Sequence, residues 1–162
     1  MDAISEIRLQ DVAPQLAAKV RQMSDMLMQE SIYIRVTQAL RSWSQQDALY
    51  AQGRTAPGRI VTNVAGGYSY HNFGLAVDCV PSAGGTTYIP DWNAEHPAWK
   101  RMETIGQSLG MDSGATWRSF PDAPHFQITG RFPEGEPSDE VRQLFKDGGM
   151  QAVWNEVFNG GQ

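Results

Sequence analysis

The sequence predicts an α+β fold, in which helices flank a few strands. Apolar residues at helical spacing mark segments near both ends and in the second half of the chain, and short alternating or continuous apolar runs lie between them. The two kinds of segment do not alternate regularly, which argues against a doubly wound parallel sheet. The chain has 162 residues, enough for one domain with a substantial core.

Three short runs carry the strand signals. Residues 32–36 alternate between isoleucine or valine and polar side chains, which is typical of a half-buried strand. The apolar run at residues 75–80 predicts a buried strand, which we expect to end at Pro81 and the Gly84–Gly85 pair. Residues 124–129 form the third strand candidate.

An N-terminal helix is expected at about residues 12–30, with Asp11 as its N-cap and Pro14 in its first turn. Its predicted buried face consists of four apolar residues at helical spacing: Leu16, Val20, Met23 and Leu27.

Further helices are expected over residues 44–52 and 97–109, each followed by a glycine. Residues 53–74 are rich in glycine and small polar residues, which is typical of a loop. C-terminal helices are expected at about residues 138–159, beginning with a serine N-cap and two acidic residues, and the Gly148–Gly149 pair predicts a turn.

Composition excludes several classes of protein. Hydrophobic residues make up 41% and charged residues 19% of the chain, which is typical of a globular protein rather than a disordered one. We expect no transmembrane helix and, from the first fifteen residues, no signal peptide. The single cysteine excludes an internal disulfide and a four-cysteine zinc site. A net charge of -5 with scattered basic residues argues against nucleic-acid binding.

Two of the three histidines lie in segments that carry carboxylates. His71 precedes Asp78 in a loop-to-strand segment, and His125 opens the third strand candidate. Two imidazoles and one carboxylate can hold zinc and leave a fourth position open for water. Gly74 lets the chain turn between His71 and Asp78. Because neighbouring strand residues point to opposite faces, Cys79 should face away from such a site as a small buried hydrophobe.

Asp122 lies three residues before His125. A carboxylate there can accept a proton from an attacking water and deliver it to a leaving amine, which is the chemistry of metal-assisted amide hydrolysis. The alternative is that both histidines are ordinary hydrogen-bonded side chains. For His96, at the start of a predicted helix, the structural interpretation is the expected one.

Two ordered motifs carry a family resemblance: Ser-x-His-x-x-Gly-x-Ala-x-Asp at residues 69–78 and Asp-x-Pro-His-Phe at residues 122–126. Together they resemble the zinc-dependent D,D-peptidase and L-alanyl-D-glutamate peptidase family, which includes VanY-type carboxypeptidases and bacteriophage endolysins. Residues 49–55 are similar to its upstream motif, as is Trp117. The resemblance spans about residues 32–128 and implies a small antiparallel sheet flanked by helices, the hedgehog/D,D-peptidase-like zinc peptidase fold.

The resemblance implies that residues 1–162 form a single zinc peptidase catalytic domain, with a motif-bearing core at about residues 32–130. It implies one zinc ion per chain, with Asp122 as the general base. The implied zinc ligands are His71, Asp78 and His125.

Four further residues receive implied roles at the substrate. Arg54 is expected to point into the cleft, where a guanidinium can stabilise the oxyanion or hold a substrate carboxylate. The implied substrate-binding residues are Ser69, Gln52 and Trp117.

The motifs resemble most closely the endolysin-type enzymes, which implies hydrolysis of the L-alanyl-D-glutamate bond of a peptidoglycan stem peptide. We expect the protein to act as a monomer and not to insert into a membrane. Many dipeptidases of this group have Glu where this chain has Asp122, so dipeptidase specificity is disfavoured. The alternatives are a D-alanyl-D-alanine carboxypeptidase of the same fold and a non-catalytic, zinc-stabilised binding module. We expect synthesis in the cytoplasm and action on the cell wall. Two origins are compatible with this route: a phage lysin released at lysis and a host enzyme encoded in a prophage region.

Overall fold

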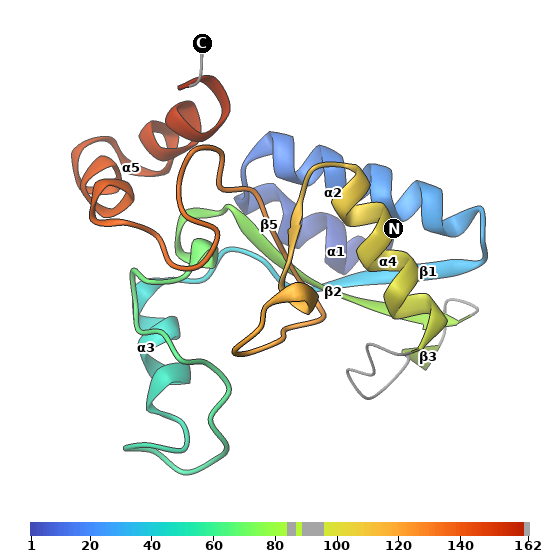
Figure 1. The fold of residues 1–162 in the computed structure, drawn as a ribbon, viewed down its shortest axis with the longest axis horizontal. Coiled ribbons are helices and arrows are strands. Elements are labelled where there is room, and N and C mark those ends of the chain that lie inside the picture. Colours follow the sequence, from blue (N-terminus) through green and yellow to red (C-terminus); the bar gives the residue numbers. More distant parts are fainter. Residues whose placement is uncertain (84–86, 89–95, 161–162) are drawn as a thin grey trace. The chain divides into compact units, whose positions relative to one another are not determined.

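The computed structural model describes residues 1–83, 87–88 and 96–160 (Figure 1). Within these residues the chain forms a five-stranded antiparallel sheet with helices beside it, which confirms the predicted α+β fold. The strands are β1 (Ile32–Gln38), β2 (Ala76–Ala83), β3 (Thr87–Tyr88), β4 (Asp112–Ser113) and β5 (His125–Gln127). The helices are α1 (Ala3–Arg8), α2 (Pro14–Met28), α3 (Trp43–Ala51), α4 (Pro97–Ser108) and α5 (Asp139–Asn159).

The strands follow the order β1-β2-β5-β4, and β3 pairs with β2. The chain separates into two compact units by its contacts. The first unit combines Met1–Ala39 with Ala76–Ile128 and contains the sheet with α1, α2 and α4. The second combines Leu40–Leu75 with Thr129–Gln162 and contains α3 and α5.

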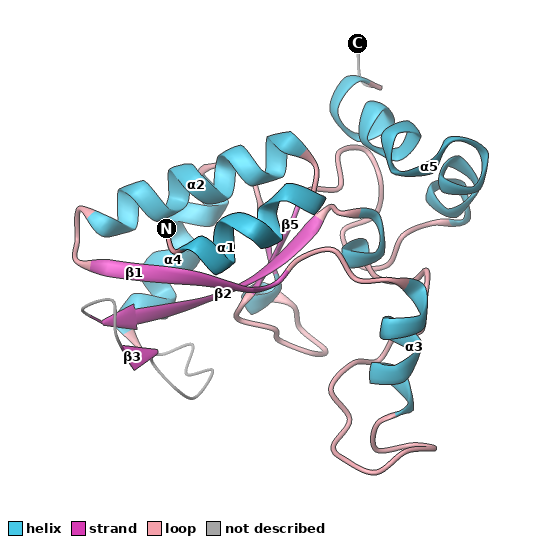
Figure 2. Cartoon of the chain, turned by 180° about the vertical axis from the view of Figure 1, so that it is seen from behind, coloured by secondary structure: helices cyan, strands magenta, loops and turns pink. Residues whose placement is uncertain are grey.

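The core of the first unit lies between the sheet and its helices. Figure 2 shows α1 and α2 running over the same face of β1 and β2. Val36 of β1 pairs with Cys79 of β2, and Val77 of β2 pairs with Phe126 of β5; all four are fully buried. The four apolar residues predicted for the buried face of α2 are also fully buried. Since strand side chains alternate, the residues between these positions occupy the other face of the sheet.

The N-terminal segment differs from its prediction. Helix α2 begins at Pro14 with Ala13 as its N-cap, whereas Asp11 belongs to a preceding 3-10 turn, so the predicted Asp11 cap is wrong. Proline disfavours a helical conformation in the residue before it, which fixes the helix start at Pro14. The preceding helix α1 was not expected. Its Ser5 hydroxyl accepts a hydrogen bond from the Val36 backbone, which fastens the helix to β1.

Pro81 does not end the second strand, contrary to the prediction. It lies inside β2, opposite Ile34 of β1. The Cys79 N–H donates to the Pro124 carbonyl, on the side of β2 that faces β5. The backbone nitrogen of residue 81 points to the same side, at a position beyond the last β2–β5 pair. Among the described residues, a missing N–H at this position therefore costs no β2–β5 hydrogen bond. The Gly84–Gly85 pair lies outside the described residues.

The other predicted helices are confirmed to within one or two residues. Helix α3 begins after Ser42, which forms a capping box with Gln45. Helix α4 begins at Pro97 after His96, whose Nδ1 accepts from the Ala98 N–H, so the structural role expected for this histidine is confirmed. The predicted Gly148–Gly149 turn interrupts α5. No helix in the described part of the chain is long and apolar enough to cross a bilayer.

The second unit is built around aromatic contacts. The Trp43 ring stacks on Phe145 of α5, and the Phe73 ring meets both edge to face. The Trp154 indole N–H donates to the Phe73 carbonyl, and the Tyr70 hydroxyl donates to the Pro133 carbonyl. These contacts hold the 3-10 turn Tyr70–Phe73 in place.

Candidate metal centre

Asp78 and His125 are direct partners across the antiparallel pairing of β2 and β5. Their side chains lie on the face of the sheet opposite to Cys79, as strand alternation predicts. The His125 Nδ1 lies 3.3 Å from an Asp78 carboxylate oxygen. Cys79 is fully buried, which confirms its interpretation as a small hydrophobe.

A β-bulge in β1 lies next to Asp78. The register between β1 and β2 shifts between Val36 and Gln38, and Gln38 then pairs with Asp78. The extra residue, Thr37, donates its hydroxyl to the Asp78 carbonyl over 3.2 Å. Bulges bend a strand and redirect its side chains, so this one fixes the backbone that carries the carboxylate.

His71 lies in the 3-10 turn Tyr70–Phe73. Ser69 caps this turn, and its hydroxyl accepts a long hydrogen bond of 3.4 Å from the His71 N–H. Gly74 ends the turn in the left-handed region at a φ of 64°, which is the chain reversal expected at this glycine. The Asn72 side chain accepts from the Gly67 N–H and donates to the Arg41 carbonyl, which ties the turn to the surrounding backbone.

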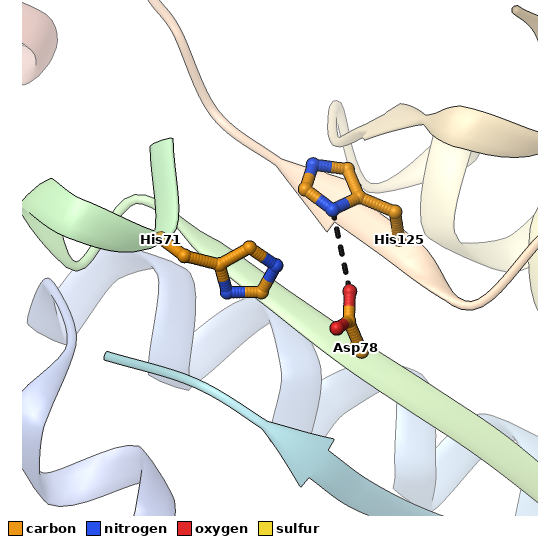
Figure 3. Close-up of side chains that lie close together, drawn as sticks. All are labelled: His71, Asp78 and His125. Atoms are coloured by element: carbon orange, nitrogen blue, oxygen red, sulfur yellow. Dashed lines mark hydrogen bonds and ion pairs between the residues drawn. The ribbon is translucent and has the colours of Figure 1, made fainter. Parts of the chain in front are cut away.

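The structure brings together the three predicted metal ligands. His71, Asp78 and His125 each offer one ligand atom, and these atoms lie within 4.8 Å of one another (Figure 3). Both histidines are buried and Asp78 is half-buried. Two imidazole nitrogens and one carboxylate oxygen are a donor set that zinc accepts in catalytic sites, so the residues fit this metal.

The environment of His125 favours a positive charge at this position. Burial disfavours the charged imidazole, but the hydrogen bond and negative charge of Asp78, together with Gln127 and Asp122, outweigh it and raise the pKa of His125. Because a metal binds the deprotonated imidazole, a proton and a metal compete for the same nitrogen.

Asp122 is anchored by the backbone around it. Its N–H donates to the Gly114 carbonyl over 2.8 Å, and its carbonyl accepts from the His125 N–H over 3.1 Å. A Cβ atom at Gly114 would lie 2.6 Å from the Asp122 carbonyl oxygen and 3.0 Å from the His125 Cβ. Only glycine permits this close approach, so Gly114 sets the distance between the two segments.

Trp117 lies at the same site, with its ring 4.9 Å from the His125 ring at an angle of 47°. Gln52 follows α3, and its side chain lies 3.7–3.9 Å from the position that a Cβ atom at Gly58 would occupy. Its predicted role at a substrate stays a prediction, as does that of Ser69, which the structure presents as a turn cap.

Arg54 makes its contacts within its own loop. The guanidinium donates to the Tyr50 and Thr62 carbonyls and to the Asn63 side chain, and it stacks over the Tyr50 ring at 4.0 Å. These contacts hold the loop after α3 in shape. These contacts do not test whether Arg54 points into a cleft, so that position stays a prediction.

Sequence reasoning missed three residues that support the predicted ligands. Gln127 contacts the His125 ring, Asn72 fastens the turn that carries His71, and Gly114 allows the approach of Asp122. The position of Gln127 was accessible in principle, because residues two apart on a strand share a face. The other two depend on contacts between distant segments, which leave no local signal.

Asp78 and His125 on neighbouring strands, with the His71 imidazole from a preceding turn, form a donor set that suits a catalytic metal. A second carboxylate, three residues before the last histidine, adds a group that can move a proton, which is the combination that a metallopeptidase needs. Comparison with known proteins supports this class. A family model described as D-alanyl-D-alanine carboxypeptidase matches residues 62–128.

The chain is 36% identical over 137 residues to the peptidoglycan L-alanyl-D-glutamate endopeptidase CwlK of Bacillus subtilis (strain 168), covering 76% of this chain and 81% of that protein. It is 29% identical over 118 residues to the L-alanyl-D-glutamate peptidase of Listeria phage A118, covering 72% of this chain but 38% of the phage protein. The crystal structure of the Serratia marcescens L-Ala D-Glu endopeptidase ChiX superposes with a TM-score of 0.55 at 25% identity, over 78% of this chain and 87% of that one.

The chain therefore belongs to the family of D,D-peptidases and L-alanyl-D-glutamate peptidases, and it is an enzyme of the hydrolase class. The family resemblance inferred from the two sequence motifs is confirmed.

Proposed function

We propose that this protein is a zinc-dependent peptidase that hydrolyses the L-alanyl-D-glutamate bond of peptidoglycan stem peptides. The observation that carries the proposal is the His71–Asp78–His125 cluster, in a chain that matches L-alanyl-D-glutamate peptidases over most of its length. The names of the two solved or curated bacterial relatives supply the substrate bond, and the donor set supplies the chemistry.

In this proposal His71, Asp78 and His125 hold one zinc ion per chain. When bound, zinc polarises the scissile carbonyl and lowers the pKa of a water to about 7. Both histidines are buried, and the contact of the His125 ring with Gln127 supports a fixed orientation of this ligand.

Asp122 acts as the general base. Its carboxylate takes a proton from the attacking water and later delivers it to the leaving amine. Asp122 lies close enough to His125 for its charge to act on the imidazole, which supports a position beside the metal ligands. The two backbone hydrogen bonds of Asp122 hold it there without the cost of reorganisation during the reaction.

Arg54 supplies positive charge to the substrate, either at the developing oxyanion or at a stem-peptide carboxylate. Its stacking on Tyr50 and its hydrogen bonds to two carbonyls support a guanidinium whose orientation is set before the substrate arrives. The proposed substrate-binding residues are Ser69, Gln52 and Trp117. Of these, Trp117 has the strongest support, because its ring lies against His125.

A D-alanyl-D-alanine carboxypeptidase is the second candidate, favoured by the description of the matching family model. The two activities differ in what they require at the end of the peptide. A carboxypeptidase needs a free terminal carboxylate, whereas an endopeptidase that cuts the first bond of the stem accepts a C-terminal amide. Digestion of matched free-acid and amidated stem peptides separates them.

The proposal includes a single catalytic domain over residues 1–162 that acts as a monomer on the cell wall. The phage-encoded relative supports release during phage lysis as the route to the wall. Light scattering on the purified protein tests the oligomeric state, and a single cooperative unfolding transition shared by both compact units tests the domain assignment.

Two substitutions test the assignment of roles. We expect Asp122→Ala to abolish turnover while zinc stays bound at one equivalent, because this carboxylate moves a proton and does not hold the metal. We expect His71→Ala to lose both zinc and activity. Asp25→Ala, at an exposed position on α2, serves as the matched control and should leave both unchanged. Normal turnover by Asp122→Ala would contradict the proposed base.

A further inference from the structure

The His125 ring makes a second buried contact, on the side away from Asp78. Its Nε2 lies 2.9 Å from the side-chain oxygen of Gln127. Gln127 is 1% exposed and His125 is 5% exposed, so bulk water does not reach this contact. The two residues are two apart on β5 and therefore project from the same face of the sheet.

Both ring nitrogens face acceptor oxygens, Nδ1 that of Asp78 and Nε2 that of Gln127, so the contact with Gln127 suits the neutral ring once a metal takes the Nδ1 lone pair. A carboxamide oxygen only accepts hydrogen bonds, so the nitrogen that faces it must donate. A neutral imidazole has one N–H, and if Nε2 holds it, Nδ1 keeps its lone pair. Nδ1 is the nitrogen that lies 3.3 Å from Asp78, on the side of the candidate metal ligands.

We propose that Gln127 is a positioning residue of this enzyme, which holds His125 in the Nε2–H tautomer so that the Nδ1 lone pair is presented to the metal. This inference rests on the proposed metal centre and adds a residue that neither sequence motif contains. In this role Gln127 acts through His125.

The backbone of Gln127 is well placed for this task. It pairs with Ala76 of β2 on one side and with Asp112 of β4 on the other, so the strand is fixed from both edges. The ring of His125 is further confined by Trp117. Outer-shell partners of metal-binding histidines commonly change metal affinity 10- to 100-fold when removed, because they set the tautomer, orientation and basicity of the ligand.

The test compares zinc binding by wild-type protein, Gln127→Met, Gln127→Glu and a control, Gln46→Met. Methionine has a similar length but no oxygen acceptor, whereas glutamate keeps an acceptor oxygen in either protonation state. Gln46 is a second fully buried glutamine, and its side chain bonds Arg41, Thr62 and Val64 rather than a histidine. Its variant reports the general effect of losing a buried amide.

Zinc affinity is measured by competition with a chromogenic chelator. We expect Gln127→Met to bind zinc about 10- to 100-fold more weakly than wild type. Gln127→Glu should remain within a few-fold of wild type, and Gln46→Met should bind zinc normally even if it unfolds more easily. Equal zinc affinity of Gln127→Met and wild type would overturn the proposal.

A second readout follows the ring itself. In the zinc-loaded wild-type protein, ¹⁵N spectra of labelled histidine should show Nδ1 of His125 bound to metal and Nε2 protonated, with a slowly exchanging proton. If Nε2 is the metal-bound nitrogen, the proposal is wrong, and this result needs no variant to fold. If wild-type protein binds no zinc at all, the proposed metal centre fails instead, so the two failures are distinguishable.

Discussion

Gly106→Ala should destabilise the protein, although it removes a glycine from the interior of a helix. In an exposed helix this change stabilises by about 1 kcal/mol. In α4, however, a Cβ atom at residue 106 would lie 2.3 Å from Cε1 and 2.8 Å from Cδ1 of Phe126. Phe126 is fully buried in β5, next to His125, so its ring has no free space to move into.

The expected magnitude follows from these two opposing effects. Overpacking a core costs typically about 1–3 kcal/mol, and contacts this short place Gly106→Ala in the upper part of that range. After the gain in helix propensity, a net loss of about 1–2 kcal/mol remains. With a urea m-value of about 2 kcal/mol/M, the unfolding midpoint should fall by roughly 0.5–1 M.

Urea unfolding followed by circular dichroism measures this shift. Gln107→Ala, at the exposed neighbouring position, is the matched control and should leave the midpoint within error of wild type or slightly above it. Adding Phe126→Leu to Gly106→Ala should cost less than Phe126→Leu costs alone, because the shorter side chain relieves the clash. A midpoint for Gly106→Ala at or above that of wild type would refute the packing argument.

Three further outcomes are expected. Burial raises the pKa of the Cys79 thiol, so a thiol reagent should leave the native protein unlabelled and modify one thiol after unfolding. In metal-free protein the pKa of His125 is raised by Asp78 despite burial, so its contribution to stability is present below the ordinary histidine pKa of about 6.5 and is lost as pH rises through the raised value. Urea unfolding of chelator-treated protein, measured from below pH 6.5 to above the raised pKa of His125, should show this loss of stability in the wild type and not in Asp78→Asn. Gly114→Ala should displace Asp122 and lower turnover by on the order of 10²-fold while zinc stays bound; unchanged turnover would contradict the role given to this contact.

Side-chain periodicity explains why much of the fold was predictable. The apolar face of α2 and the alternation in β1 depend only on helical and strand geometry. The structure buries the whole predicted face of α2 and, in β1, Ile34 and Val36, whereas Ile32 at the start of the strand is half-buried. The opposite orientation of Asp78 and Cys79 follows from the same rule. These features are properties of one segment at a time.

The incorrect or missing predictions concern contacts between segments. Helix α1 exposes Ile4 and Ile7, so it lacks the apolar face that marks a helix in a sequence, and its attachment through Ser5 is a tertiary contact. Pro81 lies inside β2 at a position beyond the last β2–β5 pair, where β5 takes no hydrogen bond from it. A strand's neighbours decide such cases, and a single sequence does not contain them.

The candidate site shows the same division. Residue type and order along the chain were enough to select His71, Asp78 and His125, and the structure brings these three together. The supporting residues Gln127, Asn72 and Gly114 were missed because their roles depend on what they contact in the fold and not on their residue type. Gln127 becomes informative only when the ring it contacts is known to face Asp78 on its other side.

Digestion of a purified peptidoglycan stem peptide, followed by mass spectrometry, tests the central claim most directly. Parallel samples contain the protein alone, the protein with a chelator, and the chelated protein with added zinc. The account predicts cleavage between L-alanine and D-glutamate, lost with the chelator and restored by zinc. Release of D-alanine would assign the carboxypeptidase activity instead, and intact peptide in all samples, with zinc bound to the folded protein, would contradict the proposed enzyme and leave a binding module.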